Sequence, residues 1–557
     1  MADKIKVFAL GGLDEYGKNH LVVEINDKIF VLASGVQFPN KLTPGIDYII
    51  ADTTYLEENK DRVKAYIMLH GHDDEMASLS FYYDKVKAPI YCSEVTKIML
   101  NNFSNHVLRK NKYDFRIIQP TSDVIIDGIP FHFFHTCHNI ADSSGVAIET
   151  SLGNIIYTSD FVVDNNSDPS YLNDFAAIAK IRTKPTLLLI IDSQYAERSG
   201  YTSPNHKIFN SIGKDVIEAK GRLFSVVFTP NAYNLGEIFE IASKTNRKIV
   251  CYDTETEQDL KTFLEASGKN LKKTSVLNRA DIGRVSEKEV LVLITGYGPR
   301  LYQKLIYIVN NVDNKEYIRI KESDTVLLAA PSNLNTEVVA TDALNEVYKT
   351  GAQIIYLNSK KLWMMHPSEE DIKTMISITN PRYFLPVKGT YKNLLAAAQI
   401  ANTMGGNLNY ASIFVIDNGD VITFDEKGAN IKQAAVPVGN KYIDGYGIAD
   451  NNSTQIAERQ NLGGDGVVIM GLSISRKEKK VIAGPDIQMR GFVFLANADD
   501  IIKILSNVML KTVEEYLQKP YANMLEAKQI IYENALRELK KETGKSPMII
   551  PLIIELD

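Results

Sequence analysis

The chain has 557 residues, of which 45% are hydrophobic and 23% charged, and its formal net charge at pH 7 is -6. This composition excludes a disordered or fibrous chain, and the length predicts about three or four folded domains. The slightly acidic balance excludes nucleic-acid binding driven by global charge, so any contact with a phosphate backbone must come from a local basic patch.

Apolar runs in the sequence are too short to cross a membrane. The longest, such as residues 186–191 and 548–554, fall short of the roughly 18–20 residues that span a bilayer. The first residues lack the apolar core of roughly 7–15 residues that marks a signal peptide. Cys92, Cys137 and Cys251 have no CxxC spacing, which argues against a disulfide frame or a zinc ribbon. The sequence therefore predicts a cytoplasmic protein with no membrane contact.

Apolar runs of strand length and helical patterns follow one another along most of the chain, which predicts an α/β fold with mixed sheets. The expected strands are, in chain order, residues 29–32, 66–69, 155–158, 187–191, 225–228, 290–294, 326–329 and 354–357. The expected helices are residues 75–86, 235–245, 335–350 and 369–378. Strand and helix alternate most regularly from about residue 197 to residue 357, as in a parallel βαβ domain, and this block looks like an insertion.

The last fifth of the chain has a different pattern. Residues 440–466 are polar, rich in glycine and asparagine, and without sustained periodicity, so we expect a linker there. A strand pair around residues 467–482, amphipathic helices at 499–517 and 524–542, and a closing strand at 548–556 follow. This pattern predicts a small α+β C-terminal domain.

The strongest chemical signal is a cluster of His70, His72 and Asp74 directly after the apolar strand at residues 63–69. Imidazole nitrogen and carboxylate oxygen suit zinc or manganese, and a loop after a buried strand can fold all three side chains toward one point. The chain has only nine histidines, so two within three positions are unusual. The alternative for this segment alone is a polar turn with chance histidines.

Two further candidates, His138 and Asp160, follow later strands. Each alone is a weak signal, because a lone histidine is more often a core or surface residue and an aspartate after a strand often caps a turn or a helix. Together with His70, His72 and Asp74, in this order and at these separations, they resemble the signature of the metallo-β-lactamase nucleases.

The rest of the chain is similar to the ribonuclease J family, a β-CASP branch of those nucleases. The segments that carry the resemblance are residues 10–19, 45–48, 192–198, 366–370, 386–391, 443–445, 484–493 and 546–551. Matches at so many ordered sites are improbable by chance, and they extend over essentially the whole length.

The resemblance implies a metallo-β-lactamase αββα sandwich with an inserted β-CASP α/β domain and a small α+β C-terminal domain. It places the metallo-β-lactamase domain at residues 1–196 and 358–440, with the β-CASP domain between them at 197–357. A linker at 441–466 and a C-terminal association domain at 467–557 complete the expected order.

The resemblance also implies a metal-dependent RNA phosphodiesterase that acts in RNA decay and ribosomal RNA 5′ maturation. Single-stranded RNA with a 5′ monophosphate would enter a groove between the first two domains, for cleavage as a 5′-to-3′ exonuclease or as an endonuclease. In the family, two metal ions activate water and stabilise charge on the scissile phosphate. Asp74 and His366 are the catalytic candidates that the resemblance assigns.

Four positions depart from the family's pattern where its chemistry lies. Ala33 stands in place of an aspartate that supports the metal loop. Glu75 and Lys388 stand in place of two metal-binding histidines, and Tyr233 replaces a histidine of the β-CASP domain. The alternative interpretation of these changes is neutral drift in an enzyme that is still active.

The ligand losses fall on one of the family's two metal sites. The site that keeps every ligand is formed by His70, His72, His138 and the bridging Asp160. The neighbouring site keeps Asp74 and Asp160. Glu75 offers it an oxygen, which favours manganese or magnesium over zinc. Lys388 offers an ammonium, which cannot coordinate a metal. We therefore expect one divalent metal, zinc or manganese, a doubtful second site, and weak or lost nuclease activity.

The segment that would bind the RNA 5′ end is also altered. The family's Ser-Gly-His-Gly-Ser stands here as Met364, Met365, His366, Pro367 and Ser368, and Pro367 removes one amide donor. The residues expected to contact RNA are Trp363, Met365, His366, Ser368, Lys388 and Arg300. A core tryptophan and a solvated arginine are the alternatives for the first and last of these.

Three functions stay open from the sequence. The leading hypothesis is a ribonuclease J paralogue of low activity that works as the partner of an active ribonuclease J, in a homo- or hetero-oligomer. A second is a stand-alone one-metal exoribonuclease that depends on a 5′ monophosphate. A third is an RNA-binding scaffold that holds no metal.

Overall fold

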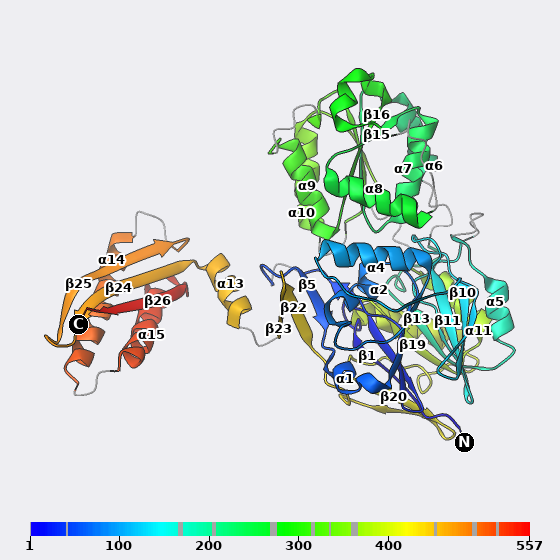
Figure 1. The fold of residues 1–557 in the computed structure, drawn as a ribbon, viewed down its shortest axis with the longest axis horizontal. Helices are drawn as coiled ribbons and strands as arrows, with labels where there is room; N and C mark the ends of the chain where they lie inside the picture. Colours follow the sequence, from blue (N-terminus) through cyan, green and yellow to red (C-terminus); the bar gives the residue numbers. More distant parts are fainter. Residues whose placement is uncertain are drawn as a thin grey trace. The chain divides into compact units, whose positions relative to one another are not determined.

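The computed structural model describes residues 2–39, 43–164, 171–202, 208–267, 276–312, 318–332, 336–357, 362, 366–450, 454–492, 498–519 and 523–556. The chain divides into two compact units, one formed by residues 1–38 and 48–445 and the other by residues 39–47 and 446–557. No helix in these described ranges is both long enough and apolar enough to cross a membrane. The larger unit contains a first lobe, up to residue 202 and again from residue 366, and an inserted lobe, residues 208–357 (Figure 1).

Two large sheets form the first lobe. The first sheet has the order β21 (Gly428–Lys432), β20 (Val421–Asp425), β1 (Ile5–Gly11), β2 (His20–Ile25), β3 (Lys28–Val31), β6 (Val63–Met68), β7 (Ile90–Cys92) and β8 (Phe115–Ile117). The second sheet has the order β19 (Tyr383–Val387), β13 (Thr186–Asp192), β12 (Gly153–Tyr157), β11 (Ser144–Thr150), β10 (Ile129–His135) and β9 (Asp123–Ile126). A small extra sheet joins β22 (Asn440–Asp444), β5 (Tyr48–Ala51) and β4 (Val36–Gln37).

The two large sheets pack face to face, and helices cover their outer faces. Side chains from both sheets, such as Val7, Phe131 and Ile190, form one apolar core between them. The helices beside the first sheet are α1 (Thr54–Glu58), α2 (Asp73–Met76), α3 (Leu79–Tyr82) and α4 (Glu94–His106). Those beside the second sheet are α5 (Phe175–Ile181), α11 (Glu369–Thr379) and α12 (Tyr391–Met404). This arrangement is the αββα sandwich that the sequence predicts.

The inserted lobe is a parallel sheet with helices on both faces. Its strand order is β15 (Lys248–Cys251), β16 (Val290–Gly296), β14 (Leu223–Phe228), β17 (Thr325–Ala329) and β18 (Gln353–Tyr356). The central strands read as continuous apolar runs because both of their faces are buried. One face is covered by α9 (Gly298–Val309) and α10 (Glu337–Lys349), and the other by α6 (Ile208–Glu218), α7 (Ala232–Lys244) and α8 (Thr254–Ser267).

The smaller unit is an α+β structure. Its sheet has the order β25 (Lys480–Arg490), β24 (Val467–Ser475) and β26 (Met548–Glu555). Helices α14 (Ala498–Leu517) and α15 (Met524–Thr543) bury one face of this sheet through residues such as Leu505 and Ile531. The unit also contains β23 (Gly447–Asp450) and α13 (Thr454–Gly464).

Two segments differ from the sequence-based expectation. The helix expected at residues 75–86 is two four-residue helices, α2 and α3, because Asn19 and Ser34 donate backbone hydrogen bonds to the carbonyls of Asp74 and Glu75. The expected linker at residues 441–466 carries regular structure, since β22 pairs with β5 and α13 follows. Local periodicity was weak there because β22 gains its stability from a strand almost 400 residues away in the chain.

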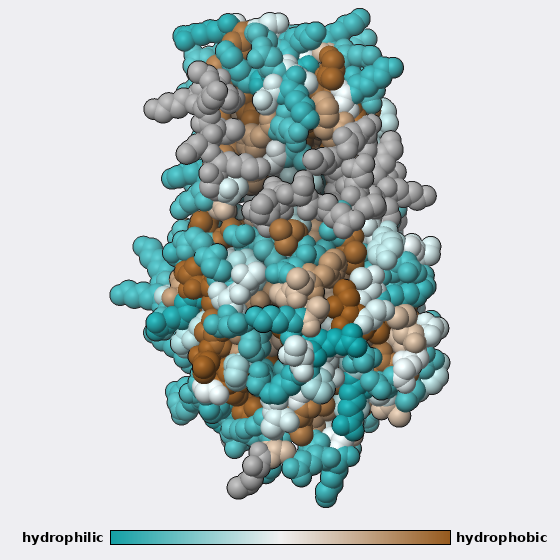
Figure 2. All heavy atoms as spheres, turned by 90° about the vertical axis from the view of Figure 1, so that its right-hand side faces the viewer, coloured by the Kyte–Doolittle hydropathy of each residue, from teal (hydrophilic) through white to brown (hydrophobic). Residues whose placement is uncertain are grey.

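The surface carries no single continuous apolar area on the face drawn in Figure 2, where apolar side chains form separate patches among polar ones. Scattered apolar side chains of this kind are normal on folded proteins.

Candidate metal centre

Strand ends bring the candidate residues to one edge of the first lobe. Strands β12, β13 and β19 are parallel neighbours, so the residues at or just after their carboxyl ends lie side by side. These residues are Asp160 after β12, Asp192 at the end of β13, and Lys388 after β19. Histidines 70 and 72 follow β6 of the facing sheet, and His138 lies in the loop after β10.

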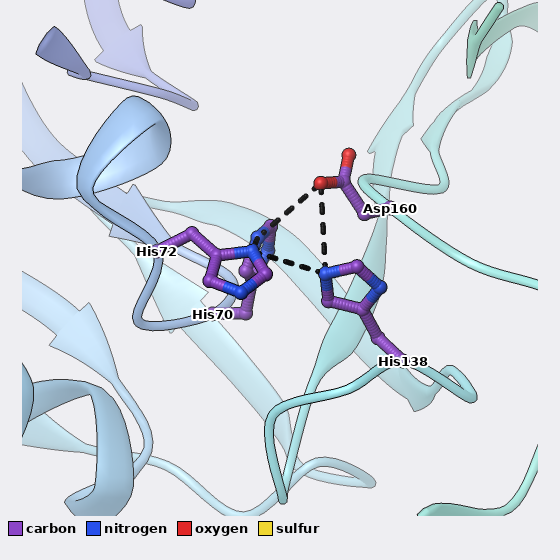
Figure 3. Close-up of side chains that lie close together, drawn as sticks. All are labelled: His70, His72, His138 and Asp160. Carbon is purple, nitrogen blue, oxygen red and sulfur yellow. Dashed lines mark hydrogen bonds and ion pairs between the residues drawn. The ribbon is translucent and has the colours of Figure 1, made fainter. Parts of the chain in front are cut away.

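Three imidazole rings and one carboxylate converge at this edge (Figure 3). Nδ1 of His72 lies 3.1 Å from Nε2 of His70 and 3.1 Å from Nε2 of His138. Oδ2 of Asp160 lies 3.4 Å from Nε2 of His70 and 3.7 Å from Nε2 of His138. Atoms that each lie about 2.0–2.2 Å from one tetrahedral ion are separated by similar distances.

The electrostatics favour a cation at this point. Burial lowers the pKa values of His72 and His138 well below their usual range, so both rings are neutral and keep a lone pair for coordination. Burial alone would raise the pKa of Asp160, but the nearby charges of Lys388 and His366 hold it well below its usual range. Its Oδ2 is buried and accepts no hydrogen bond from the described residues. The donor set and this unsatisfied oxygen fit one divalent metal.

Ser159 orients one of the rings. Its Oγ lies 3.1 Å from Nδ1 of His70, which leaves Nε2 of that ring facing Asp160. A partner on the second ring nitrogen of this kind fixes the orientation of a metal-binding histidine.

Lys388 lies beside this cluster, on the other oxygen of Asp160. Its Nζ contacts Asp160 Oδ1 and lies 2.6 Å from Oε1 of Glu75. The side chain is 3% exposed, and although burial lowers its pKa, the charges of Asp160 and Glu75 raise that pKa well above its usual value. The lysine is thus a buried ammonium that cannot coordinate, and a second metal does not fit this position.

Asn19 connects two of the three acidic residues that follow the histidine pair, Asp74 and Glu75. Its Nδ2 donates to Oδ2 of Asp74 at 3.0 Å and to Oε1 of Glu75 at 2.8 Å. Burial raises the pKa of Glu75, and the Lys388 ammonium acts against that shift. The structure therefore places Asp74 and Glu75 against Asn19 and Lys388 rather than in the group that could hold the metal.

His366 lies beside the same oxygen of Asp160 that faces the histidine cluster, and it pairs with Asp192. Its Nδ1 is 2.7 Å from Oδ2 of Asp192 and 3.8 Å from Oδ2 of Asp160. Burial lowers the pKa of this histidine, but the charges of Asp192 and Asp160 outweigh it and raise that pKa above its usual value. The ring of Tyr195 contacts His366 edge to face at 5.4 Å between centroids.

Comparison with known proteins decides the family. The description "Ribonuclease J, beta-CASP domain" matches residues 220–347, and "Ribonuclease J C-terminal domain" matches residues 454–556. A protein named Ribonuclease J 2 from Staphylococcus epidermidis is 31% identical over 552 residues, which cover 99% of this chain and 98% of that protein. The chain belongs to the ribonuclease J family. Ribonuclease J 2 from Staphylococcus aureus strain NCTC 8325 is also 31% identical, over 554 residues that cover 99% of this chain and 98% of that protein.

A solved structure supports the fold of this ribonuclease J relative. A protein of unknown function from Enterococcus faecalis V583 superposes with a TM-score of 0.53 at 14% identity, over 75% of this chain and 100% of that one. The match to the ribonuclease J β-CASP description confirms the predicted β-CASP insertion, and the two packed sheets of the first lobe have the expected αββα architecture. The described residues could hold a divalent metal in two groups that share Asp160, one with His70, His72 and His138 and the other with Asp192 and His366.

The remaining candidate residues of this ribonuclease J relative lie in different places. Trp363 and Met365 lie outside the described residues. Ser368 is buried, caps α11, and its Oγ lies 2.7 Å from the hydroxyl of Thr202. Arg300 is exposed in the first turn of α9, in the inserted lobe.

The two other positions that depart from the ribonuclease J pattern are packed against neighbours. Ala33 is buried, and no carboxylate from this position supports the metal loop. Tyr233 packs its ring against Tyr171, 5.0 Å away between centroids, and its amide donates to the carbonyl of Asn139, next to His138. A tyrosine thus braces the loop that carries the third histidine.

Two residues of the centre are not among the candidates that the sequence predicts. Asp192 lies in a segment that resembles the family, and it ends a buried strand whose parallel neighbour carries Asp160. The position of Asp192 at a strand end is therefore a signal that the sequence contains. Asn19 also lies in such a segment, but its role depends on a contact with residues more than 50 positions later, to which no local pattern points.

Proposed function

We propose that this protein is a ribonuclease J paralogue that binds single-stranded RNA with a 5′ monophosphate and holds one divalent metal, zinc or manganese. Its own nuclease activity is weak or lost, and it acts as the partner of an active ribonuclease J in RNA decay and ribosomal RNA 5′ maturation. The observation that carries this proposal is the buried ammonium of Lys388 on Asp160 and Glu75.

The proposal assigns separate roles to the residues of the centre. His70, His72, His138 and Asp160 hold the metal, which supplies Lewis-acid stabilisation and water activation when bound. Lys388 adds a fixed positive charge near the scissile phosphate but no open coordination position. His366, oriented by Asp192, can hold a proton near the reacting phosphate.

Loss of the second metal should lower the rate strongly. In a two-metal site, one ion on each side stabilises the attacking and the leaving oxygen. A point charge held by two carboxylates replaces only part of that stabilisation, and each ~1.36 kcal/mol lost is about a factor of ten in rate. Weak turnover is the expected result even with the histidine cluster fully loaded.

The proposed RNA contacts lie on the edge of the first lobe that carries the metal centre and on the inserted lobe. His366, Lys388 and the neighbouring Ser368 lie near the centre, and Arg300 is the candidate on the inserted lobe. Trp363 and Met365 remain proposed contacts on the strength of the family motif. Family membership supports RNA as the substrate class.

The smaller unit supports a role in association. Helices α14 and α15 cover one face of its sheet, while Leu552 and Ile554 on strand β26 are 44% and 55% exposed. An exposed apolar strand is a common element of protein interfaces. We assign the contact with the active ribonuclease J, or with a second copy of this chain, to this unit.

Decay of a 5′-monophosphorylated single-stranded RNA tests the proposal. The purified chain should degrade it weakly or not at all, and should raise the activity of an active ribonuclease J when the two are mixed. His70→Ala should remove the bound metal, whereas the matched control His132→Ala, a partly exposed histidine on β10, should not. Full activity of the chain alone would contradict the proposal.

The stand-alone one-metal exoribonuclease is kept as the second candidate. The complete histidine cluster and the His366–Asp192 pair favour it, because both would be needed for turnover. The third possibility, a scaffold without metal, fails if one metal stays with the purified chain and is lost in His70→Ala.

A further inference from the structure

Helix α4 of the first lobe packs against α8 of the inserted lobe (Figure 1). A cavity of about 40 Å³ lies between them. Its walls are mainly apolar, and they include Met99 and Phe103 on α4 and Phe263 and Ala266 on α8. A water needs about 10–15 Å³ of such space, so the cavity has room for about three water-sized groups. A ligand bound there would touch both lobes.

Two carboxylates line this cavity, and one of them lacks a partner. Oδ2 of Asp259 accepts hydrogen bonds from the hydroxyls of Thr229 at 2.7 Å and Thr295 at 2.6 Å. Asp73 is 8% exposed, and its Oδ2 accepts no hydrogen bond from the described residues. Among the described residues that line the cavity, none is a lysine, arginine or histidine. An unsatisfied carboxylate oxygen in such surroundings is costly unless a donor from a ligand meets it.

The chemistry of the walls restricts the ligand. The two carboxyl groups disfavour an anion. The mainly apolar surface of the walls, with Asp259 already bonded to two hydroxyls, favours a ligand with an alkyl chain over a strongly hydrated metal ion. A primary ammonium has three N–H donors for the carboxylates, and its alkyl chain suits the side chains of Met99, Phe103 and Phe263. An ammonium with its first two methylenes also matches the size of the cavity.

We propose that this cavity is a binding site for a small primary aliphatic amine, whose ammonium contacts Asp73 and whose carbon chain lies between α4 and α8. The site is distinct from the metal centre, although Asp73 stands between His72 and Asp74 in the chain. The inference does not depend on nuclease activity, on bound metal or on the partner.

Calorimetric titration of the full chain with ethylammonium chloride tests the site. The expected result is saturable binding of one equivalent, with no comparable binding of ethanol, the uncharged analogue, or of potassium chloride at the same ionic strength. Equal binding of ethanol would show a merely apolar cavity and overturn the proposal. So would the absence of saturable binding.

Two variants locate the binding site. Asp73→Asn keeps the shape but removes the acid that would pair with the ammonium, so binding should weaken at least about tenfold, whereas Asp84→Asn, an exposed aspartate of the same lobe, should leave it unchanged. Ala266→Leu fills the cavity from α8 and should abolish binding. Metal content and circular dichroism, measured for each variant, verify the fold. Undiminished binding in either folded cavity variant would refute the assignment.

Discussion

At the scale of single residues, the two oxygens of Asp160 have different contacts, and these contacts define the centre. Oδ1 contacts the ammonium of Lys388, while Oδ2 faces His70 and His138. One oxygen of this carboxylate therefore contacts the lysine ammonium, and the other faces the position that could hold a metal. A lysine in place of a histidine ligand is visible in the sequence, but the pairing with Glu75 and Asp160 needs the three-dimensional contacts.

Removal of the buried ammonium should destabilise the protein. In Lys388→Met, Glu75 and Asp160 lose their cation in a buried site, which costs about 3–5 kcal/mol for a buried ion pair that loses one partner. Urea unfolding in the presence of a chelator measures the free energy of unfolding. The control Lys392→Met removes an exposed lysine paired with Glu197 and should change little. A loss below about 1 kcal/mol in Lys388→Met would argue against a structural ion pair.

Restoring both family histidines should restore the second metal. The double variant Glu75→His, Lys388→His exchanges an ammonium and a carboxylate for two imidazoles next to Asp74 and Asp160. We expect two metals per chain and a gain of at least about tenfold in decay of 5′-monophosphorylated RNA. Each single variant should keep the metal content and the RNA decay rate of the parent protein, because one histidine completes neither the ligand set nor the charge balance. A double variant that still binds one metal would contradict this account of the centre.

At the scale of elements, the strands that carry the site could be predicted better than the helix beside it. Buried apolar runs such as residues 187–191 correspond to β13, and the ligands follow strand ends as expected. The helix expected from residue 75 onward is not continuous, because the backbone amides of Asn19 and Ser34, both distant in sequence, donate to the carbonyls of Asp74 and Glu75. Long-range backbone contacts of this kind leave no periodic trace in the sequence.

Gly35 is the residue that permits this backbone approach. A Cβ at this position would lie 1.6 Å from the carbonyl oxygen of Asp74. Gly35→Ala should therefore push the segment that carries His70 and His72 out of place and lower the free energy of unfolding by about 3 kcal/mol or more. Gly283→Ala, where a Cβ meets nothing within 4 Å, is the matched control. Thermal unfolding and metal content check both, and a Gly35→Ala protein with normal metal binding would refute the role.

At the scale of the whole molecule, family membership and architecture could be predicted because segments that resemble the family's motifs occur along the full length of the chain. The domain boundaries stay predictions, and the cut near residue 445 between the two compact units lies close to the expected start of the linker. The contribution of residues 39–47 to the smaller unit could not be predicted, because it joins chain segments about 400 residues apart.

Association should depend on the open face of the C-terminal sheet. Leu552→Lys with Ile554→Lys places two charges on exposed strand β26 and should lower the molar mass measured by light scattering, alone or with an active ribonuclease J. Leu525→Lys, at a 77% exposed position in α15, is the control and should leave the mass unchanged. An unaltered complex in the double lysine variant would assign association to another surface.

We propose that a buried lysine leaves this ribonuclease J relative with one metal position. The most direct test of this proposal is the number of metal ions per chain, measured by mass spectrometry of the elements after saturation with Zn²⁺ or Mn²⁺ and removal of the excess. We predict one ion per chain, lost in His70→Ala and retained in His132→Ala. Two ions per chain in the parent protein would contradict the account.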